Sequence, residues 1–141
     1  MAIDKIFNIA GSGMNAQMVR LNATASNLAN AGVFAGSEAE AYRAKRPVFE
    51  TLVNSNLKGY SKDFLGGVKV ANIIDDKGDI KQIHDPSNIL ADENGFAYGS
   101  SVSEVSEMVE MMAAARSYEN NAKVMSTAKQ LLLRTLEISK V

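Results

Sequence analysis

Apolar residues recur at helical spacing through the last third of the chain, residues 102–139. Steps of three, four or seven residues place these side chains on one face of a single long helix. No Pro or Gly follows Val102, and at about 1.5 Å per residue the helix would be roughly 57 Å long. Ser101 and Glu104 have the spacing of a capping box at its start. The face comprises Val105, Met108, Met112, Ala115, Ala122, Met125, Ala128, Leu132 and Leu136, and is widened by Val102, Val109, Tyr118 and Leu131.

A second stripe, with steps of three and four, predicts another amphipathic helix over residues 3–30. Gly32 lies just beyond it, where a C-cap glycine is expected. Only Asp4, Lys5 and Arg20 are charged in this segment, and the face opposite the stripe is polar but uncharged. Because solvent-exposed helices usually carry Lys and Glu there, we expect this helix to be surrounded by other protein. The stripe consists of Ile3, Phe7, Ala10, Met14, Met18, Leu21, Ala25 and Leu28.

The middle of the chain has a different character, because it holds eight of the ten glycines and both prolines. Residues 42–50 have the pattern of an extended segment, which Pro47 restricts to the edge of a sheet. Two segments with apolar residues, 68–74 and 80–83, flank a charged stretch with a glycine, residues 75–79, which is typical of a hairpin. Their apolar residues are Val68, Val70, Ile74, Ile80 and Ile83. We therefore expect a small β-rich insertion between the two helices.

The predicted fold is mainly α with a small β-rich insertion, in which the two long terminal helices form an α-helical coiled-coil hairpin. The expected divisions are residues 1–32, 33–100 and 101–141. The shorter helix cannot cover the whole apolar face of the longer one, so apolar surface is left over. We expect such a chain to complete its folding on assembly, because ordering each residue costs about 1–2 kcal/mol that burial must offset.

Composition excludes several classes of function. Fifteen Lys and Arg nearly balance sixteen Asp and Glu, which gives no indication of a nucleic-acid partner. Cys is absent and His84 is the only His, so disulfides, thiolate zinc sites and sites with two imidazoles are excluded. We expect no catalytic residue, cofactor, metal or small-molecule substrate. No apolar run is long enough to span a membrane, and Asp4, Lys5 and Asn8 interrupt any cleavable signal peptide.

Residues 11–16 match the dinucleotide-binding fingerprint G-x-G-x-x-A, and Glu38 lies near the distance expected for a ribose-binding acid. That motif requires a buried strand before the glycines, whereas here a helical stripe runs through them. We expect close approach of a neighbouring segment to explain Gly11 and Gly13. A small nucleotide-binding enzyme is therefore a distant alternative, behind another helical assembly or adaptor protein.

Several segments resemble a known family. Residues 12–16 (Ser-Gly-Met-Asn-Ala) and 25–30 (Ala-Ser-Asn-Leu-Ala-Asn) are similar to the amino-terminal signature of bacterial flagellar rod and hook proteins. Residues 42–50, 91–96 and 107–121 narrow the resemblance to the proximal-rod members of that family. The chain departs from the family pattern at residues 31–36 and 98–102, which are linker positions.

The resemblance implies a non-catalytic structural subunit of the basal-body proximal rod that transmits torque. It implies assembly with other rod subunits and with copies of the chain in a helical rod. It also implies export into the periplasm by the flagellar type III apparatus, without a cleaved signal peptide. The terminal helices would line the central tube.

The stripes of the two helices supply the expected assembly interface. Met14, Leu21 and Leu28 are expected to pack against Met112, Met125, Leu132 and Leu136, within or between subunits. Asn27 and Asn30 are expected to close the first helix through side-chain-to-backbone hydrogen bonds. The interface residues are Phe7, Met14, Met18, Leu21, Asn27, Leu28, Asn30, Val105, Met108, Met112, Tyr118, Met125, Leu132 and Leu136.

Overall fold

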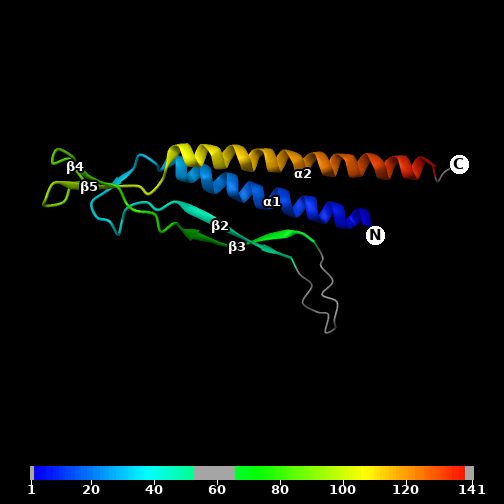
Figure 1. The fold of residues 1–141 in the computed structure, drawn as a ribbon, viewed down its shortest axis with the longest axis horizontal. Coiled ribbons are helices and arrows are strands. Elements are labelled where there is room, and N and C mark those ends of the chain that lie inside the picture. The colour runs from blue at the N-terminus through cyan, green and yellow to red at the C-terminus, as the bar shows by residue number, and fades with distance from the viewer. Residues whose placement is uncertain (1, 53–65, 139–141) are drawn as a thin grey trace, which may run out of the picture.

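The computed structural model describes residues 2–52 and 66–138. Two long helices lie side by side and antiparallel, and the strands are gathered along one side and at one end of the pair (Figure 1). The elements in chain order are α1 (Ala2–Ala29), β1 (Phe34–Ala35), β2 (Lys45–Thr51), β3 (Val68–Asp75), β4 (Gln82–His84), β5 (Phe96–Gly99) and α2 (Glu104–Ile138). The prediction of two long terminal helices with a small β region between them is confirmed. The coiled-coil character of the pair stays a prediction.

The face of α2 that packs on α1 differs from the predicted stripe over its first half. Val105, Met108 and Met112 are 74%, 54% and 55% exposed. Steps of four and three instead lead along the buried and half-buried positions Glu107, Met111, Ala114, Tyr118, Asn121, Met125, Ala128 and Leu132. We call these eight residues the inner face. The stripe predicted from hydrophobicity therefore does not face α1 over the first half of α2, because the inner face carries a charged residue and an amide at two of its positions. Whether that stripe contacts other subunits stays a prediction.

Both predicted helix caps are wrong. The first intrahelical bond of α2 runs from the amide of Glu107 to the carbonyl of Ser103, at 2.9 Å. The hydroxyl of Ser101 instead accepts the amide of Ala44 at 3.0 Å, so it serves a strand segment rather than the helix. At the end of α1, Gly32 does not have a positive φ. The Asn30 side chain donates to the Ser26 carbonyl at 2.8 Å and satisfies the helix end that a C-cap glycine would otherwise serve.

A two-stranded antiparallel sheet of β2 and β3 lies along α1, on the side away from α2 (Figure 1). The hydroxyl of Ser12 accepts the amide of Val68 at 3.1 Å and fixes the start of β3 to the helix. The sheet covers Ser12 on the uncharged polar face of α1, whereas Asn8, Asn15 and Asn22 remain exposed in a single copy. Residues 42–50 were expected to be extended, and β2 confirms this, with Pro47 on a strand that has only one neighbour.

The expected hairpin between residues 68–74 and 80–83 does not form. β3 pairs with β2, and β4 pairs with β5 in a three-stranded sheet of order β1-β5-β4 at the far end of the molecule. The Asp76 carboxylate accepts the Gly78 amide at 3.2 Å, and Arg43 donates to the Gly78 carbonyl at 3.0 Å. These bonds turn the chain out of β3 before a local partner strand can align.

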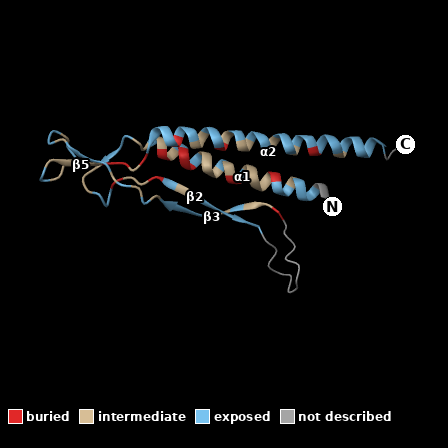
Figure 2. Cartoon of the chain, viewed as in Figure 1, coloured by how far each residue is buried: buried red, intermediate tan, exposed pale blue. Residues whose placement is uncertain are grey.

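The interior is thin. Every buried apolar residue within the described ranges is an alanine except Val102. Figure 2 shows the buried residues gathered on α1 and at the segments that join the helices, whereas the outside of α2 is exposed along most of its length. Large apolar side chains therefore lie at the surface of a single copy. The buried alanines are Ala10, Ala16, Ala23, Ala41, Ala44, Ala97, Ala114 and Ala128.

Candidate assembly surface and its buried junction

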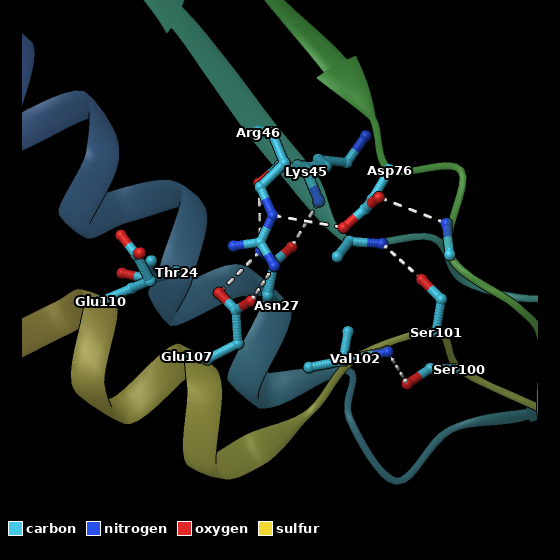
Figure 3. Close-up of polar contacts among 12 residues, drawn as sticks. Thr24, Asn27, Lys45, Arg46, Asp76, Ser100, Ser101, Val102, Glu107 and Glu110 are labelled. Carbon is cyan, nitrogen blue, oxygen red and sulfur yellow. Dashed lines mark hydrogen bonds and ion pairs between the residues drawn. The ribbon is translucent and has the colours of Figure 1, made fainter.

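A polar cluster joins α1, α2 and the start of β2 (Figure 3). Asn27 and Glu107 are both fully buried. The Asn27 amide donates to the Glu107 carboxylate at 3.0 Å and to the Lys45 carbonyl at 3.0 Å. The Asn27 carbonyl oxygen accepts the Lys45 amide at 2.7 Å and the Tyr42 hydroxyl at 3.1 Å. One side chain thus fastens both helices to the first residue of the strand.

Arg46 supplies the charge that balances the buried carboxylate of Glu107. Its Nη2 lies 2.7 Å from Glu107 Oε1, which is an ion pair rather than an aligned hydrogen bond, because that oxygen accepts no well-directed N–H. Arg46 also lies 3.5 Å from the Asp76 carboxylate, and its side chain is 36% exposed. Water therefore reaches the arginine but not the glutamate. We call Asn27, Tyr42, Lys45, Arg46 and Glu107 the buried junction.

The segment before α2 completes the attachment. Ser100 is buried and donates its hydroxyl to the Ala31 carbonyl at 2.9 Å, just after α1. The amide of Val102 donates to the Ser100 hydroxyl at 3.2 Å, and the Val102 side chain is buried. Beside the buried junction, Arg20 on α1 forms an ion pair with Glu110 on α2. The helices are thereby tied together at the end where α1 stops and α2 begins.

The residues of the expected interface divide into three groups. Asn27 lies in the buried junction and bonds to the backbone of β2, so the expectation that it closes its own helix is wrong, whereas Asn30 does close it. Eight residues are half-buried: Phe7, Met14, Leu21, Leu28, Asn30, Tyr118, Met125 and Leu132. Five are exposed: Met18, Val105, Met108, Met112 and Leu136. Their role in assembly stays a prediction.

Close packing along the helix pair explains Gly13 of α1 but not Gly11, although both were expected to allow close approach of a neighbour. A Cβ added to Gly13 would lie 2.9 Å from Asn121 Nδ2 on the inner face. A Cβ added to Gly11 would lie 3.7 Å from the terminal methyl of Met125, an ordinary contact. Met14 and Met125 line one hollow between the helices, as expected for packing within a subunit. Met112 has no part in that packing and faces outward.

On α2, an outer stripe and an end groove of apolar residues remain uncovered. The outer stripe consists of Val105, Met108, Val109 and Met112, each more than half exposed. The end groove is an open hollow of about 410 Å³ near the start of α1 and the second half of α2. It is lined by Ile6, Lys123, Val124, Thr127, Ala128 and Leu131. Contiguous apolar surface of this kind marks a site of protein interaction.

Sequence reasoning missed the buried junction, although one signal pointed to it. Seven-residue steps back from Ala128 lead through Asn121 and Ala114 to Glu107. A charged residue in register with a buried seam indicates a buried ion pair. The partner could not be identified this way, because Arg46 comes from a distant strand. The apolar loop residues Ile89 and Leu90 were also missed, since no periodicity marks them.

The described residues contain no cluster of three or more His, Asp or Glu side chains that could hold a metal ion. Neither helix in the described ranges combines the length and apolar character that crossing a bilayer requires. Residues 11–16, which match the dinucleotide fingerprint, lie inside α1 with no strand before them in that part of the chain. The structural context that this fingerprint needs is therefore missing there.

The sequence is similar to known proteins over nearly its whole length. Residues 7–33 match the family model described as "Flagella basal body rod protein", and residues 93–138 match "Flagellar basal body rod FlgEFG protein C-terminal". "Flagellar basal-body rod protein FlgC" of Salmonella typhimurium is 43% identical over 98% of both chains. The protein of that name from Escherichia coli is 44% identical over 98% of both chains. The one from Buchnera aphidicola subsp. Acyrthosiphon pisum is 43% identical over 99% of both.

Proposed function

The chain belongs to the FlgC family of flagellar basal-body rod proteins, and from this premise we propose that it assembles into the proximal rod with other rod proteins and with copies of itself. As a member of this family it is a structural subunit of the flagellar basal body. Full-length identity above 40% carries this conclusion. The segments that match the two family models contain most of α1 and α2, and the similarity to the relatives also extends over the β region between them.

The exposed apolar surface supports a role in assembly. A single copy leaves the outer stripe and the end groove uncovered. Most of these side chains are already about half buried in one copy, so covering the rest of each contributes roughly 1 kcal/mol. Packing between subunits therefore supplies stability that the alanine-lined interior of one copy does not.

Transmission of torque requires that rotation of one subunit turns the next without slipping. The buried junction ties α1, α2 and β2 into one unit through directional bonds. A force applied to the β region is therefore transmitted to both helices, because the connection between them is rigid. Torque transmission and the placing of the helices around a central channel are part of the proposal.

The route to the rod is also proposed. Export through the flagellar type III apparatus, with an uncleaved amino terminus, would deliver the chain to the periplasm. Such export requires an unfolded chain. Burying an alanine removes little apolar area from water, so an interior built from alanines contributes little to the free energy of unfolding. The chain can therefore be kept unfolded for export more readily.

Isolated basal bodies provide the test. A flagellated host that lacks this chain is expected to make basal bodies without a complete rod, and the wild-type chain is expected to restore the rod and swimming. Replacing Val105, Met108 and Met112 by Ser is expected to leave helicity by circular dichroism unchanged and to abolish incorporation into the rod. Glu119→Ser with Asn120→Ser, both at exposed positions of α2, is the control and should incorporate normally. Normal rods built from the triple variant would contradict the proposal.

A further inference from the structure

The loop between β4 and β5, residues 85–95, contains the only Asn-Gly pair in the sequence, Asn94 and Gly95. In such a pair the asparagine loses its side-chain amide without an enzyme. The backbone nitrogen of the glycine attacks Cγ of the asparagine, the new C–N bond closes a five-membered succinimide ring, and the side-chain nitrogen leaves as ammonia with the glycine's amide proton. Water then opens the ring to aspartate or isoaspartate, so the net reaction is hydrolysis of the amide. Glycine permits the attack because it has no side chain to crowd its nitrogen.

The folded loop holds these two residues in a geometry that opposes ring closure. The carbonyl oxygen of Asp92 accepts the Gly95 amide at 2.9 Å, which closes a β-turn over residues 92–95. Neither central residue of this turn has a positive φ, so the turn is type I, in which ψ of the third residue is about 0°. That ψ directs the Gly95 nitrogen away from the Asn94 side chain, whereas ring closure requires both on the same side. The hydrogen bond also retains the proton that this nitrogen must lose before it attacks.

The side chain of Asp92 fixes the same turn. Its carboxylate accepts the amides of Asn94 at 2.9 Å and of Phe96 at 2.8 Å, and its own amide donates to the Phe96 carbonyl at 2.8 Å. Asn94 is exposed, so water already reaches its side chain. The reaction in the folded chain is therefore limited by how often the turn opens, and not by access of water.

We infer that Asn94 is a site of spontaneous deamidation in the unfolded chain, and that the turn held by Asp92 suppresses the reaction in the folded chain. Isoaspartate at position 94 inserts a methylene into the main chain, directly before the β4–β5 pairing that begins with His84 opposite Phe96. The modified chain cannot close the same turn in register with β5. The inference goes beyond the proposed function and does not rest on it, because the reaction requires only the chain and water.

Peptide mass spectrometry of the purified chain tests the inference. At one pH and temperature, Asn94 is expected to be converted roughly tenfold faster in guanidinium chloride than in buffer, with folding in buffer verified by circular dichroism. Asn72 is the internal control, because it is also exposed but is followed by Ile73, whose branched side chain crowds the attacking nitrogen. Equal rates at Asn94 in the two solvents would overturn the inference. Equal conversion of Asn72 and Asn94 in guanidinium chloride would also overturn it.

Substitution of Asp92 separates the effect of the turn from that of folding in general. Asp92→Ala removes the acceptor of the Asn94 and Phe96 amides and is expected to raise the rate at Asn94 in buffer about fivefold. Asp92→Asn keeps an acceptor oxygen and should leave the rate close to the wild-type value. The loop lies at the end of the molecule opposite the free ends of the helices (Figure 1), so helicity by circular dichroism should be the same in all three chains. A wild-type rate in Asp92→Ala, or an equal rise in both variants, would overturn the role of the Asp92 carboxylate.

Discussion

Asn27 on α1 donates its side-chain amide to the buried carboxylate of Glu107 on α2 at 3.0 Å, across 80 positions of sequence. The same amide group reaches the backbone of Lys45 on β2. The two ends of the chain and its middle thus share one hydrogen-bonding centre. The stability of the helix pair therefore depends on a strand that lies outside it, and this dependence can be measured.

Substitution of Arg46 is expected to destabilise the protein more than substitution of Glu107. Arg46→Ala leaves a fully buried carboxylate without its counter-charge and should lower the free energy of unfolding by about 3 kcal/mol. Glu107→Gln leaves an arginine that water reaches and should cost about 1 kcal/mol. Urea unfolding followed by circular dichroism measures both values. The double variant should lose less than the sum of the two, and strict additivity would show that the pair is not coupled.

Asn27→Asp tests the hydrogen-bonding centre with almost no change in volume. The aspartate cannot donate to Glu107 or to the Lys45 carbonyl, and it places a second carboxylate beside the first. The free energy of unfolding should fall by about 2 kcal/mol or more. Asn22→Asp, at an exposed position of the same helix, is the matched control and should change it by less than about 0.5 kcal/mol. Similar losses from both variants would point to helix propensity instead.

Gly13 and Gly11 should respond with opposite signs to replacement by Ala. Alanine is favoured over glycine within a helix by about 1 kcal/mol. At Gly11 the new methyl makes an ordinary contact, so Gly11→Ala should raise the melting temperature. At Gly13 it would crowd Asn121, so Gly13→Ala should lower the melting temperature. In an Asn121→Ala background, Gly13→Ala should become stabilising, and a persistent loss there would show that the amide is not the obstacle.

Ala114 is completely buried between the helices, and its neighbour Ala113 is exposed. Ala114→Leu should therefore lower the free energy of unfolding by about 1–3 kcal/mol through overpacking. Ala113→Leu makes the same change in helix propensity, and its free energy of unfolding should stay within about 0.5 kcal/mol of the wild-type value. Thermal unfolding of the two variants side by side makes the comparison. Equal stability would mean that the helices can separate to accept a larger residue.

The two helices were predictable because local spacing alone defines an amphipathic helix, and α1 and α2 lie within a few residues of the predicted bounds. The strand pairing was not predictable from local spacing. Residues 68–74 and 80–83 looked like one hairpin, but the first joins β2 and the second joins β5. Which extended segments meet is decided by contacts across the whole fold, such as Ser12 with Val68.

The packing between the two helices of one copy was predicted only in part for a similar reason. Met14 and Met125 share one hollow, as their periodicity suggested. Val105 and Met112 satisfied the same pattern yet face solvent, because the position between them that packs inward belongs to Glu107. Whether a glutamate can be buried depends on its counter-ion, and hydrophobic spacing along one helix carries no information about Arg46.

The alanines between the helices also set the distance between the two helix axes. Ala10, Ala114 and Ala128 are already among the smallest side chains available, so the spacing of the two helix axes has almost no room to shrink. Any larger residue there would widen the pair. In the proposed rod, with such pairs arranged around a central channel, each added methylene would be multiplied around the circumference and would change the diameter of the channel. The proposed function therefore makes these small residues the ones that set the diameter of the rod.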